Sequence, residues 1–189
     1  MKLQHGNMKV NGTVAYVTQQ AWIFNETLQE NILFGLPYNE QRYKATIAAC
    51  GLKRDLELLS NGDLTEIGEN GYNLSGGQKQ RVSLARAVYS DRDIYLLDDP
   101  LSAVDANVAS YIFHNCIHGP NAMLSGKTII MVSHNTMALE GCDRLVVIKD
   151  GTILEEGSPA ELAKLEGGDY SSLLKEISRD TCSPTSNAI

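Results

Sequence analysis

The stretch LSGGQKQRVSLARAVY at residues 74–89, with IYLLDD at residues 94–99 behind it, decides the fold class. The first part predicts a helix from about Gly76 to Tyr89, with Ser75 as its N-cap and an apolar stripe on one face. Arg86 falls outside that stripe. The second part is a short apolar run, typical of a strand that is buried on both faces.

Strands and helices alternate on both sides of this stretch. Residues 128–132 form a second apolar run and predict another buried strand, and residues 108–116 have helical spacing. A helical stretch is also predicted from about residue 27 to residue 60. This alternation predicts an α/β fold with a mainly parallel sheet, into which a helical lobe is inserted.

Turn signals predict a hairpin near each end of the chain. Asn11-Gly12 separates residues 8–10 from residues 13–17, and Asp150-Gly151 separates two further apolar segments. Ser158 and the residues after it predict a capped helix start. The residues after Ser178 have the composition of a linker.

Composition limits the function classes. The chain has 189 residues, 43% of them hydrophobic, with a formal net charge of −7, which suits one globular domain and argues against nucleic acid as the main partner. No apolar run reaches the roughly 18–20 residues of a membrane span, and no secretory signal is visible. The four cysteines form no CxxC pair and are interpreted as reduced thiols in the core.

The segment Leu74–Gln78 predicts an anion site. Gly76 and Gly77 leave backbone amides open to close approach, the Ser75 hydroxyl can donate, and a helix N-terminus carries about half a positive charge. Phosphate suits such a site best. The alternative interpretation is an ordinary glycine-rich helix cap.

Two carboxylates follow the apolar run that ends at Leu97. Ligands bind at the carboxyl ends of parallel strands, so Asp98 is a candidate Mg²⁺ ligand and Asp99 a candidate group to orient or deprotonate a water. The alternative is an Asp-Asp-Pro turn that closes the strand. His134 follows the second apolar run in the same way, and for it a purely structural role is the commoner one.

In their order and spacing, these motifs resemble the nucleotide-binding domain of an ATP-binding cassette transporter. Gln19 matches the family's Q-loop, Leu74–Gln78 its signature, Ile94–Asp98 its Walker B motif, Leu101–Asp105 its D-loop and His134 its switch histidine. The resemblance covers about residues 8–175. Three segments are similar to the multidrug-resistance-associated (C) subfamily, and most like its first nucleotide-binding domain: residues 12–24, 30–35 and 98–105.

The resemblance implies a P-loop NTPase-like, three-layer fold with a parallel sheet and a helical lobe. It places N-terminal strands and the Q-loop of the ATPase core at residues 1–23, the helical lobe with the signature helix at 24–90, the rest of the core at 91–177 and a flexible tail at 178–189.

The same resemblance assigns roles to the candidate residues, with ATP and Mg²⁺ as cofactors. It implies metal contacts from Asp98 and Gln19, and catalytic roles for Asp99, His134 and Gln19. It also implies nucleotide contacts from five residues of the signature and the D-loop: Ser75, Gly76, Gly77, Gln78 and Asp105.

Two features depart from the family pattern. No GxxxxGK[ST] phosphate loop precedes Gln19, so the sequence is interpreted as an N-terminally truncated fragment whose own site binds ATP weakly or not at all. Loss of the strand that carries this loop is expected to uncover apolar sheet surface and to lower solubility. Asp99 stands where most family members have a catalytic Glu and is one methylene shorter, which predicts slow hydrolysis unless the backbone shifts to compensate.

The resemblance also implies partners. A second cassette would pair head to tail with this one, so that Ser75–Gly77 caps a nucleotide held by the partner and Asp105 lies at the contact. Membrane domains would dock near Trp22, Ile23 and Phe24, which are otherwise interpreted as core of the helical lobe.

The sequence therefore predicts a domain of an exporter that couples ATP hydrolysis to transport, at the cytoplasmic face of a membrane. The alternatives are a non-catalytic regulatory fragment of such a transporter and a soluble ATPase of the same superfamily. The transported substrate and the membrane cannot be read from these residues.

Overall fold

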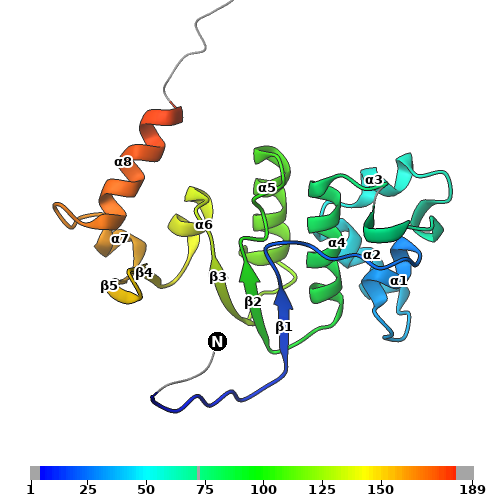
Figure 1. Ribbon diagram of the computed structural model, residues 1–189, viewed down its shortest axis with the longest axis horizontal. Helices are drawn as coiled ribbons and strands as arrows, with labels where there is room; N and C mark the ends of the chain where they lie inside the picture. The colour runs from blue at the N-terminus through cyan, green and yellow to red at the C-terminus, as the bar shows by residue number, and fades with distance from the viewer. Residues whose placement is uncertain (1–4, 72, 182–189) are drawn as a thin grey trace, which may run out of the picture. The chain divides into compact units, whose positions relative to one another are not determined.

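The computed structural model describes residues 5–71 and 73–181 (Figure 1). The chain divides into two units, Met1–Val132 and Ser133–Ile189. The first unit contains a three-stranded sheet and most of the helices, and the second contains a hairpin with two short helices and one longer helix.

The first unit is built on a parallel sheet with the strand order β1-β2-β3. The strands are β1 (Val14–Val17), β2 (Ile94–Asp98) and β3 (Thr128–Val132). Each pairs in parallel with its neighbour, so that the carboxyl ends of β1, β2 and β3 lie at one edge of the sheet. The predicted α/β class with a parallel sheet is thereby confirmed.

One face of the sheet is covered. Ala15 and Val17 of β1 and Tyr95 and Leu97 of β2 are buried, and by the pairing register they share this face. The long helix α4 (Gly76–Tyr89) packs on β1. After β2, the chain forms α5 (Ala106–Ile112) and continues into the π-helix η3 (Phe113–Ile117), which contributes Phe113, Cys116 and Ile117 to the core.

The opposite face of the sheet is open. Tyr16 of β1 is 58% exposed, and Ile130 and Val132 of β3 are 60% and 63% exposed. Because Tyr16 pairs with Leu96 and Leu96 with Ile130, these side chains lie in a row on the same face. The prediction that residues 128–132 are buried on both faces is therefore wrong for this face, since the described helices of the first unit cover the other one.

We expect this open face to drive self-association of the chain in solution. Ile130→Lys places a charge in the middle of the row, where the side chain is already solvated, so it should lower association without loss of stability. Light scattering at increasing concentration measures the effect. Ile148→Lys is the matched control, because Ile148 is 67% exposed in another part of the chain. An equal effect of both variants would show that added charge, and not this face, controls association.

The predicted N-terminal hairpin does not form. Only Val14–Val17 is a strand, and it pairs with β2 in place of residues 8–10. The reason lies at Thr13, whose amide and hydroxyl both donate to the Asp93 carboxylate, at 2.7 and 2.8 Å, and anchor β1 beside β2. These two bonds hold the pKa of Asp93 below its usual range.

The helical stretch predicted for residues 27–60 consists of three helices: α1 (Leu28–Leu33), α2 (Glu40–Ala49) and α3 (Lys53–Leu58). Two short 3-10 turns, η1 (Gly62–Leu64) and η2 (Glu69–Gly71), lead from α3 to α4. Gly35 and Gly51 interrupt the stretch with positive φ angles of 76° and 67°, a conformation that suits glycine. Thr27 and Asn39 cap α1 and α2 with their side chains.

The signature helix α4 begins and ends where the sequence predicts. Its N-cap is Ser75, its last residue is Tyr89, and Tyr89 donates to the Pro37 carbonyl oxygen at 2.6 Å. Arg86, which lies outside the predicted apolar stripe, is nevertheless only 8% exposed, because the whole second half of α4 is buried. Polar partners and aromatic rings from the segment before α1 and from α1 itself surround this residue.

The second unit is organised around the predicted hairpin at Asp150-Gly151. Strands β4 (Leu145–Lys149) and β5 (Thr152–Gly157) pair in antiparallel fashion, with α6 (Thr136–Gly141) before them and α7 (Pro159–Leu162) after them. Ser158 and Glu161 form the predicted capping box of α7. Leu145, Leu162 and Tyr170 make the core of this unit.

The last helix, α8 (Asp169–Thr181), includes the first residues of the predicted tail 178–189; residues 182–189 lie outside the described part. Among the described residues, no helix combines the length and the apolar character that crossing a membrane requires. The predicted boundaries of the helical lobe and core at residues 23, 90 and 177 remain predictions.

Candidate functional site

The N-terminus of α4 is a complete capping box. The Ser75 hydroxyl oxygen accepts from the backbone N–H of Gln78 at 3.3 Å. In return, the Gln78 side-chain oxygen Oε1 accepts from the backbone N–H of Ser75 at 2.8 Å. The Ser75 oxygen is used as an acceptor, and within the described part of the chain its O–H makes no hydrogen bond, so it can donate to a ligand. Ser75 and Gly76 are exposed, so this donor and the helix N-terminus face solvent.

Gly77 lies against the turn that follows β2. A Cβ built on Gly77 would be 2.8 Å from the Ala103 carbonyl oxygen, whereas one on Gly76 would meet only the Ala103 side chain, at 3.9 Å. The first distance is closer than real Cβ contacts, so only glycine lets the first turn of α4 approach this loop. The signature and the predicted D-loop are therefore in direct contact within one chain.

This contact predicts different outcomes for two neighbouring glycines. Gly77→Ala should lower the free energy of unfolding by about 1–3 kcal/mol, the usual cost of forced overpacking, because backbone must move. Gly76→Ala, the matched control, should cost nothing measurable. Urea unfolding of both variants measures the difference; equal stabilities would contradict the close approach of Gly77 and Ala103.

The carboxyl end of β2 holds the two predicted carboxylates. Asp98 is the last residue of β2 and lies on the open face, where the Tyr16 hydroxyl is 3.5 Å from its Oδ2 atom. Asp99 is buried and has a left-handed backbone with a φ of 47°, and its amide donates to the Val132 carbonyl oxygen at 2.9 Å. Aspartate adopts this conformation more readily than most other non-glycine residues, and Asp91 and Asp150 share it.

The turn from Asp99 to Asp105 connects the two parts of the candidate site. The Ser102 hydroxyl donates to the Asp99 carbonyl oxygen at 3.0 Å, and Ala103 contacts Gly77 as described above. Asp105 is the N-cap of α5 and accepts from the Val108 amide at 3.1 Å, while it remains exposed. The structure thus brings the signature, the end of β2 and the predicted D-loop together.

Two further predicted site residues belong to other segments of the chain. Gln19 is exposed in the loop two residues after β1 ends, and this loop leaves the sheet at the same edge as β2 and β3. His134 is exposed and belongs to the second unit, two residues after the end of β3.

The donor set for a metal is small. Among the described residues, no group of three or more His, Cys, Asp or Glu side chains is arranged to hold a metal ion. Oxygen ligands from Asp98 and Gln19 nevertheless suit Mg²⁺, which usually keeps several waters and takes one or two protein oxygens together with substrate phosphates. The residues present therefore fit Mg²⁺ only as part of a nucleotide complex.

An aromatic cluster surrounds Arg86. Its guanidinium carbon lies 3.9 Å from the ring centre of Trp22 and 5.3 and 5.4 Å from those of Phe24 and Phe34, and its Nε atom donates to the Asn31 carbonyl oxygen at 2.7 Å. No carboxylate pairs with Arg86 within the part of the chain that the structure describes. Burial lowers the pKa of Arg86 to about 10, and the ring faces and carbonyl oxygens stabilise its charge.

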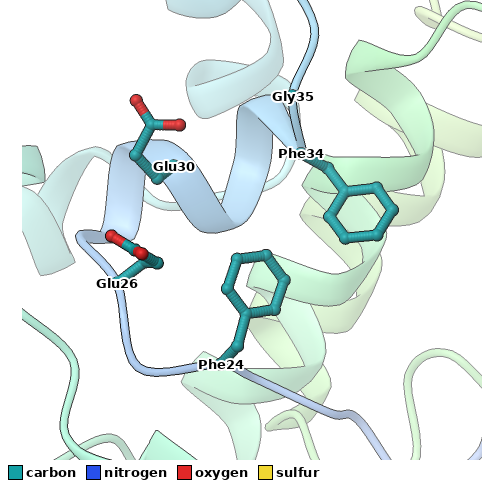
Figure 2. Close-up of a pocket in the computed structure, with 5 residues that line it drawn as sticks. All are labelled: Phe24, Glu26, Glu30, Phe34 and Gly35. Carbon is teal, nitrogen blue, oxygen red and sulfur yellow. The ribbon is translucent and has the colours of Figure 1, made fainter.

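Beside this cluster is a pocket of about 400 Å³, lined by Phe24, Glu26, Glu30, Phe34 and Gly35. Figure 2 shows the two phenylalanine rings turned toward α4 and the two carboxylates on the other side of the pocket. Trp22 is 45% exposed whereas Ile23 is 7% exposed. Ile23 therefore belongs to the core, as one of the two interpretations expects, whereas Trp22 contributes to the surface.

Sequence reasoning missed two contributors to this region. Tyr16 reaches Asp98 because both lie on the open face, a proximity that only the register of β1 and β2 reveals. Asp55 of α3 contacts Gln78 and Arg81 of α4, at 2.9 and 2.7 Å, across a gap of more than twenty residues. No local sequence signal distinguishes Asp55 from an ordinary exposed aspartate.

The sequence profile of the family described as "ABC transporter" matches residues 3–102 of this chain, more than half of its length. The chain belongs to the ABC transporter family. Cassette domains of this family bind ATP together with Mg²⁺ and hydrolyse the nucleotide, so the predicted anion site and carboxylates belong to a nucleotide-binding fold.

Similar proteins narrow the relationship to sub-family C. "ATP-binding cassette sub-family C member 2" of Homo sapiens is 53% identical over 181 residues, which are 96% of this chain and 12% of that protein. The protein of the same name from Mus musculus is 55% identical over 88% of this chain and 11% of its own length. "ABC transporter C family member 12" of Dictyostelium discoideum is 54% identical over 93% of this chain and 13% of its own length. The chain therefore spans about an eighth of the relatives that it matches.

Proposed function

We propose that this cassette completes an ATP site of a sub-family C transporter from the signature side. In this proposal, Ser75, Gly76 and Gly77 contact the phosphates of a nucleotide that a second cassette holds. The observation that carries it is the N-terminus of α4, where a glycine pair, an exposed backbone and an available Ser75 O–H donor meet. Gln78 holds the cap, and Asp105 lies at the contact with the second cassette.

The chain's own half of a second ATP site uses the end of β2. Asp98 and Gln19 would hold Mg²⁺, which supplies charge neutralisation on the phosphates when bound. Asp99 orients or deprotonates the attacking water, with His134 and Gln19 as further polar contacts. Asp99 is one methylene shorter than Glu, and its backbone is held at Val132, which supports slow hydrolysis at this site.

The 189 residues contain no GxxxxGK[ST] loop, so by themselves they supply no phosphate cradle to this half-site. We therefore expect the chain alone to bind ATP weakly or not at all. Isothermal titration of the chain with Mg·ATP tests this expectation, and a dissociation constant in the micromolar range would contradict it. Weak binding here leaves the signature-side role intact.

Within the whole transporter, the cassette would couple ATP hydrolysis to substrate export from the cytoplasmic face of the membrane. The exposed Trp22 and Phe34, beside the pocket with Glu26 and Glu30, offer an apolar surface to the membrane domains. Trp22→Ala in the whole transporter should reduce transport per ATP hydrolysed, because Trp22 joins this surface to Arg86 of the signature helix. Unchanged transport and hydrolysis rates would remove the coupling role.

The direct experiment is complementation in trans. A second sub-family C cassette that has an intact phosphate loop and a disabled signature is mixed with this chain, and ATP hydrolysis is measured against chain concentration. A saturable rise in rate supports the proposal. No rise, although the two proteins bind each other, favours the second candidate: a regulatory fragment that occupies a partner without completing its site.

A further inference from the structure

Asp55 is the centre of a nearly buried polar group beneath the signature. The side chains of Asp55 and Arg81 are 13% and 11% exposed, and Arg81 Nη2 donates to Asp55 Oδ2 at 2.7 Å. The other carboxylate oxygen, Oδ1, accepts from Gln78 Nε2 at 2.9 Å. Arg81 Nε is buried and has no hydrogen-bond partner among the described residues, so Arg81 depends on Asp55.

The direction of these hydrogen bonds determines the orientation of the Gln78 side-chain amide. A carboxylate can only accept, so the NH₂ group of Gln78 must face Asp55. The oxygen of the same amide then faces the other way, and there it accepts from the Ser75 amide at 2.8 Å. A residue in α3 thus determines a hydrogen bond at the first turn of α4, at the edge of the candidate nucleotide site.

We infer that Asp55 is a positioning residue of the signature. It holds the side-chain amide of Gln78 in the one orientation in which Gln78 Oε1 accepts from the Ser75 backbone N–H and keeps Ser75 in its capping geometry. The inference rests on the proposed function only for its effect on ATP hydrolysis. Its structural part concerns Gln78 and Ser75 alone and can be tested without nucleotide.

Asp55→Asn is a demanding test because it changes almost no volume. Asn has a single oxygen, and Arg81, whose buried Nε finds no partner among the described residues, should take it through Nη2. The NH₂ group of the new asparagine then faces Gln78. The Gln78 side-chain amide must turn, so that its oxygen faces residue 55 and its NH₂ group faces the backbone amide of Ser75. Two donors would then meet, and the Ser75 bond would be lost.

The double variant Asp55→Asn/Arg81→Met reverses this logic. With the guanidinium removed, the Asn oxygen can return to Gln78 Nε2, and the Gln78 oxygen can again accept from Ser75. Arg81→Met alone should leave the Ser75 bond in place, because Asp55 remains an acceptor. If Asp55 and Arg81 formed only a structural ion pair, the Ser75 bond would be weakened in the double variant at least as much as in either single variant.

The measurement is amide hydrogen exchange at Ser75 in the full 189-residue chain. Asp55→Asn should raise the exchange rate about tenfold, the factor that corresponds to one lost hydrogen bond. The double variant and Arg81→Met should stay within about twofold of the original chain. Unchanged exchange in Asp55→Asn, or no recovery in the double variant, overturns the inference. If Asp55→Asn does not fold, a tenfold rise in Arg81→Met alone overturns it equally.

The same variants are then compared in the complementation assay. The kcat of hydrolysis should fall with Asp55→Asn and recover in the double variant, with KM for ATP little changed, because the nucleotide is held by the partner cassette. If Ser75 exchange follows the expected pattern and hydrolysis does not, the positioning role stands and the proposed signature-side function fails.

Discussion

Replacing Asn31 by Leu is expected to lower the free energy of unfolding by about 3–5 kcal/mol, the largest stability effect that we predict for a single side chain. Asn31 is completely buried in α1. Its Oδ1 atom accepts from the Phe24 amide at 3.1 Å and from Arg86 at 3.2 Å, and its Nδ2 atom lies 3.0 Å from the carbonyl oxygens of Phe24 and Thr27.

Leucine has the same branched shape, with bulkier methyl groups, but makes none of these bonds. The Phe24 amide would lose its acceptor, and a buried guanidinium would lose one of its few polar partners, so two buried donors would remain unsatisfied. Because natural domains have only about 5–15 kcal/mol of stability, such a loss approaches complete unfolding.

Urea unfolding followed by tryptophan fluorescence measures this effect. Trp22 is the chain's single tryptophan, and it stacks on Arg86, so its emission reports on the same cluster. Glu30→Gln on the same helix is the control, since Glu30 is exposed and its replacement should change stability by less than about 0.5 kcal/mol. If Asn31→Leu were no less stable than Glu30→Gln, the hydrogen bonds of the Asn31 side chain would contribute nothing to the stability of the chain.

Ser75→Asp is expected to lower complemented ATP hydrolysis at least about 100-fold, the range reported for loss of one donor at a charged reacting group. Aspartate is as good an N-cap as serine, so α4 should keep its start. The new carboxylate, however, removes the O–H donor and places a negative charge where a phosphate is expected.

Ser75→Thr is the matched control, because threonine keeps both the cap and the hydroxyl donor, and its rate should stay within a few-fold. Unfolding curves of both variants should overlay that of the original chain, which separates binding from folding. A rate for Ser75→Asp near that of Ser75→Thr would mean that no phosphate approaches this helix.

Most of the fold could be predicted because its signals are local. The spacing in residues 76–89 and the cap at Ser75 define α4, and apolar runs define β2 and β3. The predicted hairpin at Asn11-Gly12 was wrong because the Thr13–Asp93 bonds, which join residues 80 positions apart, outweigh a favourable turn sequence. Such a partner is invisible in any short window.

The surroundings of Arg86 and the role of Asp55 could not be predicted from the sequence. A charged residue outside an apolar stripe is normally solvated, but three rings from residues 22–34 cover Arg86 in the folded chain. Asp55 has its effect only through the orientation of the Gln78 amide. Motifs identify groups that touch a ligand, whereas the residues that orient those groups depend on how helices pack.

The parallel pairing of β1 and β2 has a consequence for how the protein is made. The bonds that anchor β1 connect residues 80 positions apart. At a synthesis rate of about 5–20 residues per second, the first strand emerges roughly 4–16 s before its partner exists. During this interval Val14–Val17 lacks both its partner strand β2 and the helix α4, which follow it in the chain. The nascent chain should therefore depend on chaperones until Asp98 has left the ribosome.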